Sequence, residues 1–117
     1  METIIKPWGK ECIFADRPRY IAKFLHIKAG HRLSLQYHMY KEETINLLSG
    51  KVDLTFVDEK TTLNYHLEPG HTFLIEPGQK HRLTALEDSV IIEVSTPGMD
   101  DVVRLSDDYG RGIDSGD

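Results

Sequence analysis

Short segments that alternate apolar and polar side chains run through most of the chain, and they constrain its fold more than any other feature. Between residues 20 and 96 these segments are separated by turn pairs such as Pro69-Gly70 and Pro77-Gly78. Alternation with a period of two is typical of β-strands with one buried face, whereas a helix would repeat every 3.6 residues. About eight or nine short strands joined by such turns predict an all-β antiparallel sandwich or barrel.

The length and charge of the chain argue against several classes of protein. The 117 residues suit one domain, which we expect to span 1–117 with an ordered core over about 5–111. The net charge of −5 and the absence of a basic run with interleaved aromatics argue against a nucleic-acid partner. The N-terminus lacks the apolar core of a signal peptide, and no apolar run reaches the roughly 18 residues of a membrane span. We therefore expect a cytoplasmic protein without a membrane partner.

Gln36, His38 and Glu43 lie within one stretch, residues 30–50, at intervals that suit a metal site. Gln36 and His38 are two residues apart on a predicted strand, so their side chains point to the same face. Glu43 follows a polar turn that could bring its carboxylate back against them, and His81 on a later strand is the leading candidate for a further ligand. This mixture of nitrogen and oxygen donors suits one divalent metal ion, such as Zn, Mn, Fe, Co or Ni.

The intervals between these residues resemble the two sequence motifs of the cupins. The first motif is usually written G-x5-H-x-H-x3-4-E-x6-G, and it is matched, with glutamine in place of the first histidine, by Gly30, Gln36, His38, Glu43 and Gly50. The second motif, G-x5-P-x-G-x2-H, is matched, with glutamate in place of the proline, by Gly70, Glu76, Gly78 and His81. The resemblance implies a double-stranded β-helix, also called a jelly-roll or cupin barrel. After Pro97-Gly98 the sequence changes character, and residues 99–111 could form a short helical turn or a surface tail.

The resemblance can be narrowed to one branch of the cupins. The segments KPWGKE, LSLQYHMYKEE, HRL, IIEV and DDVVRLSDDYGR are similar to the C-terminal cupin domain of type II phosphomannose isomerases (mannose-6-phosphate isomerases), over roughly residues 6–111. Where that family commonly has a histidine, this sequence has Tyr40. The resemblance implies conversion of a phosphorylated sugar between aldose and ketose through an enediolate. It also implies that the metal is held by Gln36, His38, Glu43 and His81.

Four further residues are candidates for catalysis or substrate binding. Lys23 could direct a cation into the barrel. Glu93 is the tentative base, because burial on an inward face would raise its pKa toward the useful range. Arg82 belongs to the HRL segment and is a candidate for both roles, although alternation turns it away from His81. As the resemblance implies, Lys23, Arg82 or Arg111 would hold the phosphate.

The sequence leaves two other functions open. His38, His81 and Glu43 alone form the two-histidine, one-carboxylate set of non-haem Fe(II) oxygenases. A small cupin could also bind a sugar or metabolite without converting it, because one fold hosts many activities. For all these functions we expect a homodimer in which the partner covers an edge strand.

Overall fold

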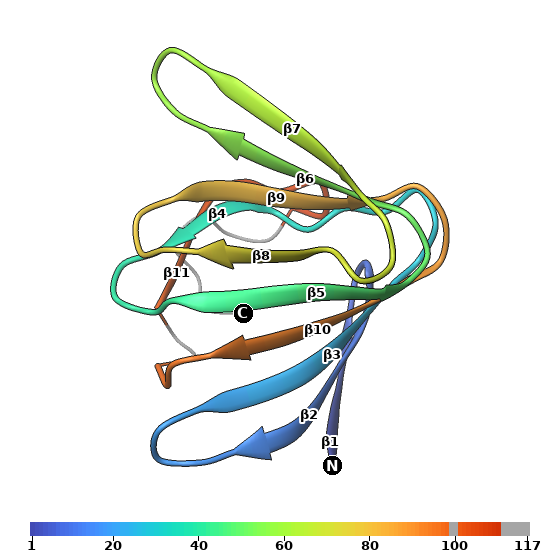
Figure 1. Ribbon diagram of the computed structural model, residues 1–117, viewed down its shortest axis with the longest axis vertical. Helices are drawn as coiled ribbons and strands as arrows, with labels where there is room; N and C mark the ends of the chain where they lie inside the picture. Colours follow the sequence, from blue (N-terminus) through green and yellow to red (C-terminus); the bar gives the residue numbers. More distant parts are fainter. Residues whose placement is uncertain (99–100, 111–117) are drawn as a thin grey trace.

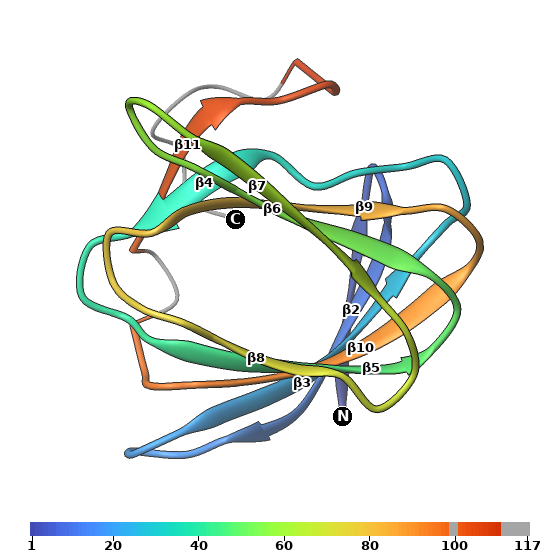
Figure 2. The same ribbon diagram turned by 45° about the horizontal axis from the view of Figure 1, so that its top comes forward.

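In the part of the chain that the structure describes, eleven β-strands form two antiparallel sheets that pack face to face (Figure 1, Figure 2). The structure is a computed structural model, and it describes residues 1–98 and 101–110. One sheet has six strands in the order β1-β2-β3-β10-β5-β8, and the other has five in the order β11-β4-β9-β6-β7. The strands are β1 Glu2–Lys6, β2 Gly9–Asp16, β3 Ile21–Ile27, β4 Leu35–His38, β5 Glu43–Ser49, β6 Val52–Val57, β7 Thr62–Leu67, β8 Thr72–Ile75, β9 Lys80–Ala85, β10 Ser89–Ser95 and β11 Val102–Ser106. None of the described residues forms a helix that is long and apolar enough to cross a membrane.

The chain crosses repeatedly from one sheet to the other, as a jelly roll requires. β3 and β5 lie in the six-stranded sheet, whereas β4 and β6 lie in the five-stranded sheet. In Figure 2, β3, β5, β8 and β10 form one side of the barrel, and β4, β6, β7 and β9 form the other. The predicted all-β double-stranded β-helix is confirmed.

The interior of the barrel divides into a polar end and an apolar end. On β5, Glu43 is followed at two-residue intervals by Ile45 and Leu47, and all three are buried. On β9, His81 is followed in the same way by Leu83. The apolar core consists of Trp8, Leu25, Ile27, Leu33, Ile45, Leu47, Val52, Leu54, Leu67, Ile75, Leu83, Ala85 and Ile91. Burial of these side chains stabilises the fold, at about 25 cal/mol per Å² of apolar surface, and the polar end carries the ionisable groups.

The C-terminal segment differs from the expected helical turn or surface tail. Val102–Ser106 form β11, which pairs with β4 and places Val102 opposite His38 and Arg104 opposite Gln36. Val102 and Arg104 are buried, so the segment adds two inward-facing side chains to the barrel. This alternation extends over so few residues that the sequence does not distinguish it from a polar tail.

Gly50, between β5 and β6, adopts a conformation that favours glycine. Its φ is +95°, and a Cβ atom there would collide with Ser89 Oγ and lie 2.6 Å from the carbonyl oxygen of Asp88. Gly70 is a matched control, because its φ is +96° and, apart from its chain neighbours, no described residue has an atom within 4 Å of its Cβ position.

We expect Gly70→Ala to lower the free energy of unfolding by about 1 kcal/mol, which is the backbone cost alone. Gly50→Ala should lower it by about 3 kcal/mol, because overpacking adds to that cost. Urea unfolding of the two variants measures the difference, and equal losses would contradict the expectation.

Candidate metal centre and the cavity beside it

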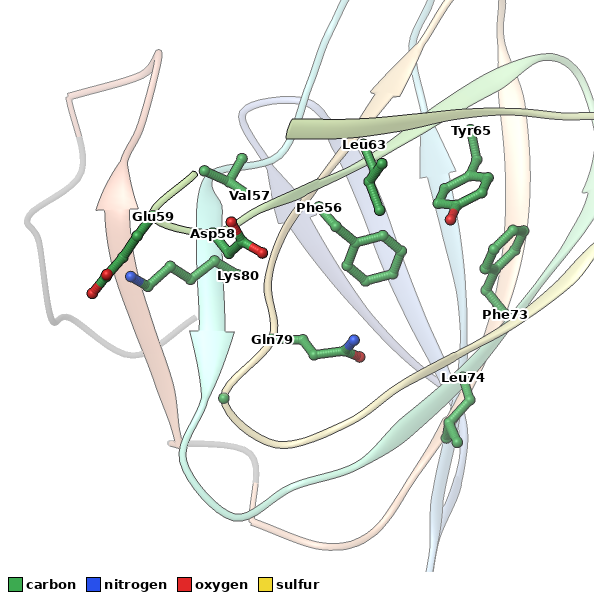
Figure 3. Close-up of a pocket in the computed structure, with 11 residues that line it drawn as sticks. Phe56, Val57, Asp58, Glu59, Leu63, Tyr65, Phe73, Leu74, Gln79 and Lys80 are labelled. Atoms are coloured by element: carbon green, nitrogen blue, oxygen red, sulfur yellow. The ribbon is translucent and has the colours of Figure 1, made fainter. Parts of the chain in front are cut away.

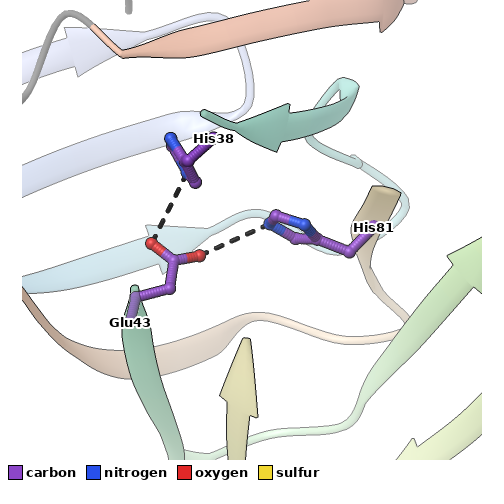
Figure 4. Close-up of side chains that lie close together, drawn as sticks. All are labelled: His38, Glu43 and His81. Carbon is purple, nitrogen blue, oxygen red and sulfur yellow. Dashed lines mark ion pairs between the residues drawn. The ribbon is translucent and has the colours of Figure 1, made fainter. Parts of the chain in front are cut away.

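Three side chains that could bind a metal meet at the polar end of the barrel (Figure 4). His38 ends β4, Glu43 begins β5, and His81 lies near the start of β9. Glu43 lies between the two imidazoles: its Oε2 is 3.6 Å from His38 Nε2, and its Oε1 is 3.4 Å from His81 Nε2. All three residues are at most 4% exposed, and one ligand atom from each lies within 4.8 Å of the others. The three residues form a cluster that could hold a metal ion.

The turn between β4 and β5 is held by Asp101. The Asp101 carboxylate accepts hydrogen bonds from the backbone N–H groups of Met39, Tyr40 and Lys41, at 2.9, 2.8 and 2.8 Å. Lys41 is 4% exposed and lines the cavity beside the cluster, whereas Tyr40 is 82% exposed. Tyr40, which stands where the family commonly has a histidine, therefore faces solvent and not the metal cluster.

The pKa values of the two histidines of the cluster are shifted in opposite directions. Burial and the positive charge of Lys41 lower the pKa of His38 to about 4, so this imidazole is neutral at pH 7. Burial opposes protonation of His81, but the hydrogen bond and charge of Glu43 outweigh it and raise the pKa of His81. His81 Nδ1–H donates to the carbonyl oxygen of Gln79 at 2.8 Å, which leaves Nε2 toward Glu43. A metal ion would compete with the proton that Glu43 favours on His81, so metal binding should weaken as pH falls.

Gln36 lies beside the cluster on the same face of the sheet. It is 7% exposed, pairs with His81 in the β4–β9 ladder, and its Oε1 accepts a hydrogen bond from Ser34 Oγ at 2.8 Å. Glu43 Oε2 is buried and has no hydrogen-bond partner among the described residues. Such an oxygen is costly unless a cation compensates it. Two imidazoles, a carboxylate and a neighbouring amide therefore fit a borderline divalent ion.

A small cavity next to the cluster is lined by charged side chains. Lys23 Nζ donates a hydrogen bond to Glu11 Oε1 at 2.7 Å and lies 3.4 Å from Glu93 Oε2. Lys41 Nζ lies 4.0 Å from the same oxygen of Glu93, and Lys6 Nζ lies 3.6 Å from Glu11 Oε2. The cavity has a volume of about 20 Å³, which is room for roughly one water molecule. The other lining residues are Trp8, Leu25, Leu33, Gln36 and His38.

Glu93 has the surroundings of a general base. Burial and the negative charge of Glu43 raise the pKa of Glu93, and Lys23 and Lys41 only partly oppose the rise. Burial disfavours the charged form of Lys23, but Glu93 and Glu11 outweigh it and raise the pKa of Lys23. Lys23 is therefore a fixed cation, and the pKa of Glu93 moves toward the range in which proton transfer near neutral pH is efficient.

Arg82 lies outside this cavity, and Arg111 lies outside the described residues. Arg82 directly follows His81 on β9, so its side chain points to the opposite face of the sheet. Its Nε donates to the carbonyl oxygen of Leu33 at 2.8 Å, and its Nη2 donates to that of Ser106 at 3.2 Å. Arg82 thus ties neighbouring segments together on the outer face and is not brought to the metal cluster.

Three buried ionisable residues, Lys41, Glu11 and Arg104, escape prediction from the sequence. Lys41 lies in a polar turn, where lysines are normally exposed. Glu11 and Ile13 are two residues apart on β2 and are both buried, so this spacing could have shown that Glu11 points inward. Arg104 is 2% exposed and lies opposite Gln36 on β11, so its side chain points to the inner face of the sheet.

A second pocket is larger and mostly apolar (Figure 3). It opens between the edge strands β7 and β8, has a volume of about 560 Å³, and is lined by Phe56, Tyr65 and Phe73, whose rings point toward a common space. Phe56 lies opposite His81 in the β6–β9 ladder. The two acidic residues that line this pocket, Asp58 and Glu59, are exposed. The buried charges therefore favour the smaller cavity as the place for acid–base chemistry.

The double-stranded β-helix, with two histidines and a glutamate gathered at one end, is that of a cupin. Among solved structures, the chain is similar to an uncharacterized conserved protein with a double-stranded β-helix domain from Klebsiella pneumoniae. The TM-score is 0.69 at 18% sequence identity, and the match covers 88% of this chain and 84% of that chain. At this identity the likeness shows the fold alone.

The family follows from the sequence comparison. The family model described as "Mannose-6-phosphate isomerase C-terminal" matches residues 1–107, and the chain belongs to this family. The alginate biosynthesis protein AlgA of Pseudomonas aeruginosa is 35% identical over 116 residues, covering 92% of this chain and 23% of that protein. A mannose-1-phosphate guanylyltransferase of Salmonella montevideo is 33% identical over 116 residues, with the same coverage of 92% and 23%. The chain thus spans about a quarter of the length of the curated relatives it matches, and the predicted resemblance is confirmed.

Proposed function

We propose that this domain is a metal-dependent sugar-phosphate isomerase of the mannose-6-phosphate isomerase type. The observation that supports this function is the position of Glu93, whose pKa is raised, in a cavity that His38 of the metal cluster also lines. An aldose–ketose interconversion needs a base beside an electrophile, and these residues would supply both. Membership of the family described above agrees with this chemistry.

The reaction would be carried by the carboxylate of Glu93. Glu93 takes the proton from C2 of the aldose, and the electrons of the C2–H bond form the C1–C2 double bond of an enediolate. The proton of the C2 hydroxyl passes to O1, and Glu93 returns its proton to C1, which leaves the carbonyl at C2. Lys41 stabilises the negative charge that develops on the sugar oxygens, and Lys23 orients Glu93.

The metal would contribute electrophilic catalysis. When bound, the ion supplies a Lewis acid that polarises the sugar carbonyl and the adjacent hydroxyl. The residues that would hold it are Gln36, His38, Glu43 and His81. Gln36 would orient its amide oxygen with the help of Ser34, whose hydroxyl already donates to that oxygen at 2.8 Å.

Substrate binding requires the rim of the cavity to open, because a volume of about 20 Å³ does not admit a hexose phosphate. Lys23 already serves two carboxylates, at 2.7 and 3.4 Å, so we assign it to charge balance. Of the residues that the family resemblance implies for phosphate binding, Arg111 is the one we propose as the phosphate contact, and it lies outside the described residues.

The proposed function is tested by incubating the manganese- or zinc-loaded chain with mannose 6-phosphate in D₂O. We expect fructose 6-phosphate to appear by NMR, with deuterium entering at C1 or C2 because the carboxyl proton exchanges with solvent. No conversion, under conditions in which a known isomerase reaches equilibrium, would contradict the proposal. Tight binding of the sugar phosphate without conversion would identify a non-catalytic sugar-binding cupin instead.

One observation supports an oxygenase as a second candidate. His38, Glu43 and His81 have ligand atoms within 4.8 Å of one another, so they alone would form a three-residue set. Such a set is the arrangement of non-haem Fe(II) oxygenases. Oxygen uptake that depends on Fe(II) would support this candidate, and its absence with any metal would exclude it.

His38→Ala should weaken zinc binding by at least about 100-fold, because it removes one nitrogen ligand from the set. His66→Ala is the matched control: His66 lies on β7 and pairs with Asp53 at 2.6 Å, away from the cluster. Competition against a zinc-binding dye measures both affinities. Equal affinities in the two variants would show that the ion binds elsewhere.

A further inference from the structure

Strand β4, which ends at His38, is joined to its two neighbours to different extents. Its ladder with β9 contains a single residue pair, Gln36 opposite His81. Its ladder with β11 contains four pairs, and Val102 lies opposite His38 at the end of that ladder. The backbone N–H of Gly78 also donates to the carbonyl oxygen of His38 at 2.7 Å. The position of His38 therefore depends strongly on the segment of the chain that contains β11.

Glu43, on the other side of the β4–β5 turn, is held by strands on both sides. It lies opposite Ser95 in the β5–β10 ladder and opposite Ile75 in the β5–β8 ladder. Between His38 and Glu43, the described residues 39–42 belong to no strand. The separation of His38 Nε2 from Glu43 Oε2, which is 3.6 Å, is therefore determined in large part by the conformation of this turn.

Three consecutive N–H groups of the turn converge on the carboxylate of Asp101, which directly precedes β11. Asp101 Oδ1 accepts from Met39 N–H at 2.9 Å. Asp101 Oδ2 accepts from Tyr40 N–H and Lys41 N–H, both at 2.8 Å. Successive N–H groups that face one point form a nest that binds an anion. Burial opposes the charge of Asp101, but the three N–H groups outweigh it and lower the pKa of Asp101, so this carboxylate is ionised at pH 7.

We propose that Asp101 is a positioning residue of the metal centre. It does not belong to the ligand set, but it fixes the turn that joins two of the ligands, His38 and Glu43. It thereby holds the imidazole and the carboxylate at a separation at which one ion can contact both. This role rests on the metal ligands named in the proposed function and not on the isomerase reaction. Groups that orient metal ligands in this way contribute about 10- to 100-fold to metal affinity.

The same carboxylate links the metal centre to the charged cavity through Lys41. The Lys41 side chain is buried, and its Nζ lies 4.0 Å from Glu93 Oε2. A lysine in a polar turn normally extends into solvent. The bond from Lys41 N–H to Asp101 holds the backbone of Lys41 in the conformation from which its side chain enters the cavity. Loss of Asp101 would therefore disturb a metal ligand and a cavity cation together.

Asp58 provides a matched comparison in another turn. Its Oδ1 accepts from the backbone N–H groups of Lys60 and Thr61, at 2.9 and 2.8 Å, in the turn between β6 and β7. This is the same kind of carboxylate-to-backbone contact, but the turn carries no proposed metal ligand. Removal of Asp58 therefore shows what loosening of a turn does when His38 and Glu43 are left in place.

The role of Asp101 is tested by competition of the chain against a zinc-binding dye. We expect Asp101→Ala to weaken zinc binding by about 10- to 100-fold, and Asp58→Ala to keep the wild-type affinity. Asp101→Asn should have an intermediate affinity, because it keeps one acceptor oxygen but turns an NH₂ group toward a backbone N–H. The visible absorption spectrum of the cobalt-loaded chain reports the geometry around the ion. It should change in Asp101→Ala and stay unchanged in Asp58→Ala.

Circular dichroism and the fluorescence of the single tryptophan, Trp8, show which variants fold. Wild-type zinc affinity and cobalt spectrum in Asp101→Ala overturn the proposal, and so does an equal loss of affinity in Asp58→Ala. If Asp101→Ala does not fold, wild-type affinity in Asp101→Asn overturns it instead. A wild-type chain that binds zinc but converts no sugar phosphate contradicts only the proposed reaction. A wild-type chain that binds no zinc overturns the metal centre and the role of Asp101 with it.

Discussion

Glu93→Gln should lower kcat for sugar-phosphate isomerisation by about 100- to 10,000-fold, which is the usual contribution of a general base. The substitution keeps the shape of the side chain and removes its ability to take up the C2 proton. Glu93 is 7% exposed, so solvent has little access to replace it as the base. Zinc affinity should change little, because Glu93 is not a proposed ligand. Glu87→Gln, at an exposed position before β10, is the control and should keep wild-type kcat.

The pH dependence distinguishes a catalytic Glu93 from a structural one. The base must be ionised, so kcat/KM should fall as pH falls through the pKa of Glu93. Burial and Glu43 raise that pKa above its usual value of 4.5, so the fall should begin at a higher pH than an ordinary carboxylate gives. The Glu93→Gln variant should lack this acidic limb. A variant that keeps the limb, or keeps wild-type kcat, would show that another group transfers the proton.

The strands, and the shared face of Gln36 and His38, could be predicted from the sequence because both depend on local spacing. The two-residue interval between Gln36 and His38 fixes a shared face on any extended strand. The alternation of Leu33 and Leu35 with polar neighbours could not fix the start of β4, which begins only at Leu35. Alternation also predicted that Arg82 points away from the side of His81, and in the structure the Arg82 side chain lies on the outer face of the sheet.

The charged cavity could not be predicted in full, because it depends on contacts between residues far apart in sequence. Lys41 is buried because Asp101, sixty residues later, accepts the backbone N–H groups of its turn. Arg104 is buried because β11 pairs with β4, and a five-residue strand with a central arginine resembles a polar tail. Glu11 is buried because Lys23 meets it across the β2–β3 pair, 2.7 Å away. In each case a long-range partner determines whether the charge is inside.

Lys23→Met should lower the free energy of unfolding at pH 7.5 by about 3–5 kcal/mol, as expected when one member of a buried ion pair is removed. Lys23 is 7% exposed, and its Nζ is the nearest cation to both Glu11 and Glu93, at 2.7 and 3.4 Å. Without Lys23, Lys6 Nζ would remain 3.6 Å from Glu11, and Lys41 Nζ would remain 4.0 Å from Glu93. Both distances are too long to replace the contacts of Lys23 fully. Urea unfolding, followed by the fluorescence of the cavity-lining Trp8, measures the loss.

The loss of unfolding free energy in Lys23→Met should become smaller as pH falls, because the carboxylates of Glu11 and Glu93, left without Lys23, can take up protons. Lys23 opposes the raised pKa of Glu93, so without it the folded-state pKa rises further above the unfolded value. A carboxyl group whose pKa is raised in the folded state stabilises the fold at low pH. This contribution is lost as pH rises through the folded-state pKa. Lys23→Met/Glu11→Gln should recover part of the stability at neutral pH, whereas Lys51→Met, at an exposed position, should change it by less than about 0.5 kcal/mol. A loss in Lys23→Met that is the same at pH 5 and pH 8 would contradict an electrostatic origin and point to packing of the lysine stem.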